Sequence, residues 1–191
     1  MNKKTGALVI ALICLSVHSA AYIWAGETDQ NILDQKSAEK IQLEQETSNA
    51  SHPDTPPLSF HEILEKAEQG NAQAEYLLAR KYYFGEGVTQ DKEKAAQWHT
   101  KAANQGHATA QYVLGLLYST GDGVHQDKEK AVDWITRSAG QGLAEAQFAL
   151  GMLYRTGEDV PQDTQQAAEL ISKAAAQGNE EAMKKAAEYK L

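Results

Sequence analysis

Apolar and polar positions alternate with a fixed long period from residue 71 onward. Three blocks of thirty-six residues, 71–106, 107–142 and 143–178, follow one another without insertion. The first half of each block carries apolar residues four positions apart, which places them on one face of a helix: Ala74, Leu78 and Tyr82, then Ala110, Leu114 and Tyr118, then Ala146, Leu150 and Tyr154. The second half repeats a similar face: Ala95, Trp98 and Ala102, then Ala131, Trp134 and Ser138. The pattern predicts a helical hairpin in each block.

Glycine and aspartate mark the ends of the predicted helices at equivalent places. We expect the first helix of each block to end at a glycine, where positive φ carries no steric cost, and the second to begin after an aspartate N-cap. The second helix then ends at a further glycine, which turns the chain into the next block. These positions are Gly85, Gly121 and Gly157, Asp91, Asp127 and Asp163, and Gly106, Gly142 and Gly178.

Small residues at Ala79, Gly115 and Gly151 allow the two helices of a hairpin to approach closely. A single hairpin leaves an apolar face exposed, so successive copies are expected to stack. The sequence therefore predicts an all-α fold, a short α-solenoid of three hairpins. Half-units at 58–70 and 179–191 are expected to form capping helices at its two ends.

The repeated letters resemble the Sel1-like repeat family, a relative of tetratricopeptide repeats. They follow the pattern A-x-x-x-L-G-x-x-Y-x-x-G-x-G-V-x-x-D-x-x-K-A-x-x-W-x-x-K-A-A-x-x-G, which block 107–142 matches at nearly every position. Block 71–106 has Ala79 in place of a glycine. Block 143–178 departs further, with Asp159 for glycine, Gln166 for lysine and Leu170 for tryptophan. We expect this third block to pack less tightly while keeping the fold.

The resemblance implies a curved solenoid whose first helices line the concave side. It also implies a non-enzymatic, exported bacterial protein that binds another protein as an adaptor, regulator or inhibitor. A periplasmic immunity protein that neutralises a delivered toxin is an alternative. A β-lactam or cell-wall precursor binding protein or enzyme is a remote one.

The N-terminal residues differ in composition from the blocks. Residues 1–25 combine Lys3 and Lys4, an apolar run and small residues before Ala21, which predicts a secretory signal peptide and a periplasmic location. An uncleaved membrane anchor and secretion remain alternatives. Residues 26–57 are polar and are expected to form a disordered tether. The only cysteine, Cys14, lies in the apolar run, so the cleaved chain would form no disulfide.

Charge limits the possible partners. After removal of residues 1–25 the chain keeps 16 basic and 26 acidic residues, a net charge of −10. An acidic chain without a basic patch is not expected to bind nucleic acid, nor to insert into a membrane after signal cleavage. The expected partner is a protein whose identity the sequence does not give.

Motifs that suggest chemistry are isolated. SAEK at 37–40 fits an S-x-x-K motif, and KTG occurs at 4–6, but they lie in the tether and the signal peptide and no S-D-N accompanies them. The five histidines beyond residue 25 have no i, i+4 partner, which argues against a zinc site: His52, His61, His99, His107 and His125. We expect no catalytic residue, no metal and no cofactor.

Candidate partner-binding residues lie where the blocks differ. The face of the first helices opposite Leu78, Leu114 and Leu150 is more apolar than a solvated face requires. We call these positions the first-helix row: Gln73, Leu77, Arg80 and Phe84, then Thr109, Val113, Leu116 and Thr120, then Glu145, Ala149, Met152 and Thr156. The row is either a groove for a partner segment, with Arg80 and Glu145 orienting it, or a surface packed between neighbouring blocks.

Overall fold

The computed structural model describes residues 58–190, and these residues form eight α-helices and no β-strand. The predicted signal peptide and tether lie outside the described residues. In chain order the helices are α4 (Phe60–Glu68), α5 (Ala72–Phe84), α6 (Lys92–Asn104), α7 (Ala108–Thr120), α8 (Lys128–Gly140), α9 (Ala144–Thr156), α10 (Thr164–Ala176) and α11 (Glu180–Tyr189).

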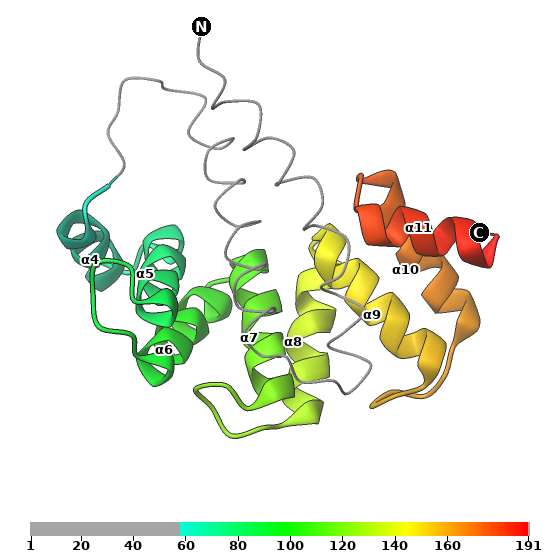
Figure 1. Cartoon of the computed structure of the whole chain (residues 1–191), viewed down its shortest axis with the longest axis horizontal. Coiled ribbons are helices and arrows are strands. Elements are labelled where there is room, and N and C mark those ends of the chain that lie inside the picture. The colour runs from blue at the N-terminus through cyan, green and yellow to red at the C-terminus, as the bar shows by residue number, and fades with distance from the viewer. Residues whose placement is uncertain (1–57, 191) are drawn as a thin grey trace, which may run out of the picture. The chain divides into compact units, whose positions relative to one another are not determined.

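Each helix packs on the next one in the chain (Figure 1). We call α5–α6 the first hairpin, α7–α8 the second and α9–α10 the third. Helix α4 precedes the first hairpin and α11 follows the third, which confirms the predicted α-solenoid of three hairpins with a half-unit at each end. Among residues 58–190, every helix is too short or too polar to span a lipid bilayer.

The turn inside each hairpin forms as predicted. Gly85, Gly121 and Gly157 all adopt left-handed backbone conformations directly after the first helix. Asp159, which replaces a glycine, adopts the same conformation with a φ of 58°. Aspartate tolerates this region better than most residues, so the third turn keeps its shape at some energetic cost.

The second helix of each hairpin begins at its predicted aspartate cap. Asp91 and Asp127 each accept a hydrogen bond from the backbone N–H three residues later, at 2.9 Å and 3.0 Å. These hydrogen bonds are the main reason that the pKa values of both carboxyl groups lie below the usual value. Asp163 caps α10 in the same way. The three aspartates therefore fix where the second helices start.

The two helices of a hairpin meet at the predicted small residues. A Cβ atom added to Gly115 would lie 2.7 Å from Ile135 Cγ1, and one added to Gly151 would lie 2.9 Å from Ile171 Cγ1. A methyl group does not fit at that distance, so the isoleucine side chains require glycine opposite them. In the first hairpin Ala79 and His99 hold the positions of this glycine and isoleucine.

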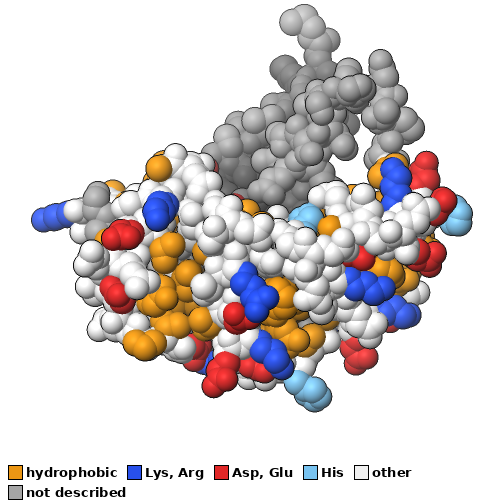
Figure 2. Space-filling model, turned by 180° about the vertical axis from the view of Figure 1, so that it is seen from behind, with side chains coloured by type: hydrophobic (Ala, Val, Ile, Leu, Met, Phe, Trp, Pro, Cys, Tyr) orange, Lys and Arg blue, Asp and Glu red, His pale blue; other side chains and the backbone are white. Residues whose placement is uncertain are grey.

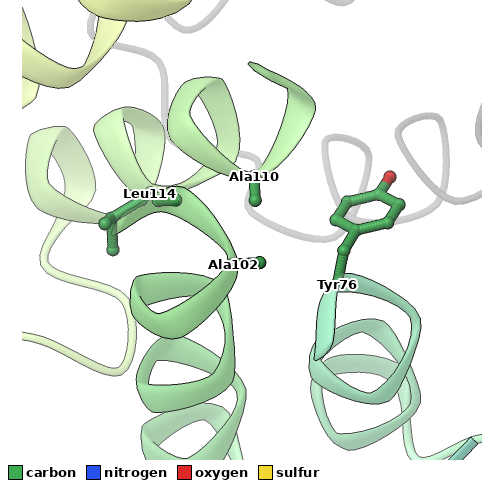
Figure 3. Close-up of a cluster of buried hydrophobic side chains, with 5 residues drawn as sticks. Tyr76, Ala102, Ala110 and Leu114 are labelled. Atoms are coloured by element: carbon green, nitrogen blue, oxygen red, sulfur yellow. The ribbon is translucent and has the colours of Figure 1, made fainter. Parts of the chain in front are cut away.

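Short side chains also let successive hairpins approach each other. Figure 3 shows Ala102 of α6 facing Ala110 of α7, with Tyr76 of α5 and Leu114 of α7 beside them. All four are buried. The apolar core therefore continues from one hairpin into the next, as expected for repeats that cannot bury their apolar faces alone.

The tryptophans are less buried than the pattern predicts. Ala95 and Ala102 are fully buried, but Trp98 and Trp134 are half-buried. Each indole packs its inner face against the core, and a cation covers it from outside: Lys101 Nζ lies 3.5 Å from the ring centre of Trp98, and Arg137 Cζ lies 4.8 Å from that of Trp134. The cations cover the part of each ring that the core leaves open.

Candidate interaction surface

The first-helix row divides into side chains that pack in the core and side chains that reach the surface. Leu77 packs against the buried clusters on both sides of the first hairpin. Val113 packs against the cluster between the first and second hairpins, and Met152 against the cluster around Ile171. For these three residues the geometry favours packing between neighbouring hairpins.

Arg80 lies deeper than its place in the row suggests, because only 3% of its surface is exposed. The equivalent residues of the next hairpins, Leu116 and Met152, are apolar and half-buried. A guanidinium inside a helical stack carries its charge into a poorly hydrated region. This makes the first hairpin electrostatically different from the other two.

The remaining positions of the row are at least partly accessible. Phe84, Thr109, Leu116, Glu145 and Ala149 are half-buried. Gln73, Thr120 and Thr156 are exposed. These side chains form the part of the row that a partner can touch without unfolding the hairpins.

Hydrophobic side chains reach the surface in patches separated by charged and polar ones on the face shown in Figure 2. Contiguous apolar patches on a soluble protein commonly mark interaction sites, whereas isolated apolar side chains are ordinary. A protein partner would therefore meet apolar and charged groups side by side on this unit.

His99 is the residue whose environment the sequence least predicted. It is 1% exposed, and its Nδ1 atom has no hydrogen-bond partner among the described residues. Burial lowers the pKa of His99 to about 3, and the nearby His107 and Arg80 act in the same direction. The imidazole is therefore neutral at ordinary pH. The sequence contains one indication that this position is buried, because Ile135 and Ile171 hold it in the other two blocks.

His107 links the first two hairpins at the edge of this region. Its ring stacks on Tyr76 with centres 4.7 Å apart, and Tyr76 lies 5.7 Å from the ring of His99. His107 Nδ1 accepts a hydrogen bond from the Ala110 backbone N–H at 3.2 Å, so Nε2 carries the proton and donates to Gln73 Oε1 at 2.9 Å. Burial lowers the pKa of His107, which fits a neutral ring in this role.

A row of hydrogen-bonded amide groups, one partner of each pair buried, repeats through the hairpins. Gln141 Nε2 donates to Gln111 Oε1 at 2.6 Å, and Gln111 Nε2 donates to the Ala103 carbonyl of the preceding hairpin at 3.0 Å. Gln177 and Gln147 repeat the first of these bonds at 2.8 Å. In the first hairpin, Glu75 takes the acceptor position and binds Gln105 at 2.6 Å. The bonds between side chains join the two helices of one hairpin, whereas the bond from Gln111 to the Ala103 carbonyl joins neighbouring hairpins; all of them satisfy polar groups that are at least partly buried.

The described residues show no arrangement typical of a metal centre. Within residues 58–190, no three side chains of the His, Cys, Asp and Glu types come together as metal ligands do. Asp91 and Asp127 cap two separate helices, as the sequence predicts. The SAEK and KTG motifs lie outside the described residues.

The comparison with protein families identifies the repeat. The model of the Sel1 repeat matches residues 72–107, 108–143 and 144–179. These segments follow the three hairpins and together cover more than half of the chain. A comparison with curated proteins finds no match.

Solved structures share this architecture. A Sel1 repeat protein from Oxalobacter formigenes is 38% identical, with a TM-score of 0.61, over 64% of this chain and 92% of its own. Helicobacter pylori cysteine rich protein B is 25% identical, with a TM-score of 0.52, over 64% of this chain and 93% of its own.

A larger protein also contains a similar region. A protective antigen present in uropathogenic Escherichia coli strains, displaying an SLR fold, is 38% identical with a TM-score of 0.61 over 64% of this chain. The match spans 26% of that antigen, so this chain corresponds to about a quarter of its length.

Proposed function

Because the chain belongs to the Sel1 repeat family, we propose that it is a non-catalytic module that binds a protein partner along the first helices of its hairpins. Sel1 repeats are generally protein-interaction modules and typically act as scaffolds without catalytic activity. The chain would act as an adaptor, a regulator or an inhibitor of the protein that it binds.

The difference between repeated and variable positions carries this proposal. The buried positions Leu78, Leu114 and Leu150 are identical in the three hairpins, and they hold the scaffold together. The accessible positions of the first-helix row differ, as in Gln73, Thr109 and Glu145, which are equivalent in the three hairpins. Since a stack of equal units presents equal surfaces, a specific partner can be recognised only where the units differ.

We place this activity in the periplasm, on the basis of residues 1–25 alone. Their positive start, apolar run and small residues are typical of a signal peptide. Cell fractionation and N-terminal sequencing of the full chain test this location, with a chain lacking residues 1–25 as the control. A full chain that remains in the cytoplasm would contradict it.

The binding experiment uses variants chosen by their exposure. Leu116→Asp combined with Thr120→Arg changes two accessible positions on α7, whereas Met152→Asp would disturb the core around Ile171. Tagged full-length chain is purified from its own cells, and the co-purified proteins are identified. The double variant is expected to lose the specific partner while its circular dichroism stays helical.

The matched control is Glu129→Arg, an exposed change at the start of α8, on a second helix. It is expected to keep the partner. Equal capture by the wild type and the double variant would contradict the proposed surface. Equal loss in the control, on a second helix, would show that binding is not confined to the first-helix row and would contradict the proposed surface.

A further inference from the structure

A cavity of about 550 Å³ lies between the second and third hairpins. The apolar part of its lining comes from Ala139 of α8, Leu150 and Tyr154 of α9, and Leu170 of α10. The polar part comes from Thr136, Gln147, Gln166 and Glu169. Lys173 of α10 stands at its rim. This volume falls within the range of sites that hold small ligands or side chains of a partner.

The other two hairpins show what fills the equivalent space. Thirty-six residues earlier, Trp134 packs beside Ala103, Leu114 and Tyr118, which are the counterparts of Ala139, Leu150 and Tyr154. Seventy-two residues earlier, Trp98 packs beside Ala67, Leu78 and Tyr82. Leu170 holds the tryptophan position in the third hairpin. The cavity therefore occupies the place where an indole packs in the first two hairpins.

The third hairpin also keeps the cation that covers the indole in the others. Lys101 Nζ lies 3.5 Å from the ring centre of Trp98, and Arg137 Cζ lies 4.8 Å from that of Trp134. Lys173 is their counterpart, and it lines the cavity with no tryptophan of its own hairpin to cover. A lysine above a ring contributes to binding through the cation–π interaction.

The lysine that lies over the counterparts of Tyr154 is replaced in the third hairpin. Lys94 Nζ lies 5.6 Å from the ring centre of Tyr82, and Lys130 Nζ lies 5.3 Å from that of Tyr118. Gln166 takes the lysine position in the third hairpin and lines the cavity beside Tyr154. The cavity thus combines an aromatic wall, aliphatic walls, the Lys173 cation and polar groups that include the Glu169 carboxylate, which together suit an aromatic side chain that carries an N–H donor.

We propose that this cavity binds a tryptophan side chain presented by a protein partner. The inserted indole would take the place of Trp98 and Trp134, between the apolar walls and Lys173. Tryptophan is a common anchor residue of interfaces, because one side chain buries a large apolar area in a fitted pocket. The partner in this inference is that of the proposed function, but the affinity of the cavity for an indole does not depend on it.

The test titrates the full chain with N-acetyltryptophanamide and follows the methyl resonances of Leu150 and Leu170. Indole entry shifts both through the ring current. We expect saturable shifts with a dissociation constant on the order of 1 mM, and none with N-acetylleucinamide, the aliphatic control. The absence of saturable shifts up to roughly 10 mM of the indole probe would overturn the proposal.

Leu170→Trp fills the cavity from within and serves as the matched variant. It restores the residue found in the first two hairpins, so the chain is expected to fold with a raised melting temperature. The Leu150 methyls should then be shifted without any probe, and the probe should no longer bind. Probe binding that persists in the folded variant would place the site elsewhere and overturn the proposal.

Lys173→Ala removes the cation while keeping the cavity. It is expected to weaken probe binding roughly two- to fivefold, the usual effect of one exposed cation–π contact. An unchanged dissociation constant of the probe would contradict the cation–π contact between Lys173 and the bound indole.

The partner itself distinguishes this inference from the proposed function. A wild-type chain that captures no protein but still binds the probe contradicts the proposed function alone. A Leu170→Trp chain that captures the partner as well as the wild type does contradicts this inference alone. Self-association of the full chain that Leu170→Trp abolishes would show a second copy as the occupant, and would overturn the assignment to a different protein.

Discussion

The first and third hairpins depart from the second in opposite ways. In the first, Ala79 and His99 replace the glycine and isoleucine of the second, so a polar ring fills the space between the helices. In the third, Leu170 replaces tryptophan and a cavity opens between hairpins. One end of the stack has gained buried polar groups, and the other has lost apolar volume.

This contrast shows that the side chains of the interior can change while the backbone of the hairpin stays regular. All six hairpin helices contain 13 residues, and the second helices all start at capping aspartates. Caps and turns act locally, so they keep the backbone regular whatever fills the interior. The interior can therefore vary from one hairpin to the next, and such variation is how a repeat protein acquires distinct sites.

The largest expected effect is the pH dependence of the free energy of unfolding, which tests the buried histidine of the first hairpin. The pKa of His99 is about 3 in the folded chain and near 6.5 in an unfolded one. Below pH 6.5 the His99 imidazole therefore binds a proton in the unfolded chain but not in the folded one. The free energy of unfolding falls as the pH decreases toward 3. We expect the free energy of unfolding to drop by about 2–3 kcal/mol between pH 6.5 and 4.5, measured by urea denaturation.

The variant for this test is Ala79→Gly combined with His99→Ile, which copies the pair found in the second and third hairpins. It should remove the contribution of His99 and leave the contribution of His107, whose pKa is also lowered by burial. The exposed change His125→Gln should leave the slope as in the wild type. A double variant with the wild-type slope would show that the pH dependence arises elsewhere.

The next largest effect converts the second hairpin into a copy of the third. Trp134→Leu removes an indole that packs beside Leu114 and Tyr118 and leaves Arg137 without its ring. We expect a loss of about 2 kcal/mol, less than the cost of truncating a buried tryptophan to alanine because leucine fills part of the space. Thermal and urea denaturation measure it. A change below about 0.5 kcal/mol would show that the tryptophan position contributes little to packing.

A smaller effect tests the close contact between glycine and isoleucine, which the second and third hairpins have and the first does not. Gly115→Ala places a methyl group against Ile135 Cγ1 and within 3.0 Å of the Ala131 carbonyl oxygen. Helix propensity favours alanine, but the clash should dominate and cost about 1 kcal/mol net. Ile135→Ala in the same chain should relieve the clash, which a double-mutant cycle detects as coupling. Stabilisation by Gly115→Ala alone would contradict the close approach.

The smallest expected effect compares equivalent lysines. Lys101→Ala removes a cation 3.5 Å from the Trp98 ring centre and should cost about 0.5 kcal/mol. Lys173→Ala, beside Leu170, has no tryptophan of its own hairpin to lose and should change stability less. Denaturation of both variants under identical conditions measures the difference. Equal costs would indicate a general effect of lysine in the last turn of these helices.

The candidate surface was only partly predictable. The sequence identified the face of α5, α7 and α9 on which the hairpins differ, but it left open whether that face is a groove or a packing surface. The structure answers residue by residue, since Leu77, Val113 and Met152 pack against buried clusters while Thr120 and Thr156 are exposed. Periodicity gives the direction of a side chain from its own helix, but not the distance to the next hairpin.

The sequence alone determined the number and order of the hairpins, their turns and their capping residues. These features depend on neighbours a few positions away in the chain, such as Gly121 or Asp127. The tertiary structure decided how deeply His99 and Arg80 are buried and that Leu170 leaves a cavity. Burial and cavities depend on the volumes of side chains from several helices together, which no single stretch of sequence contains.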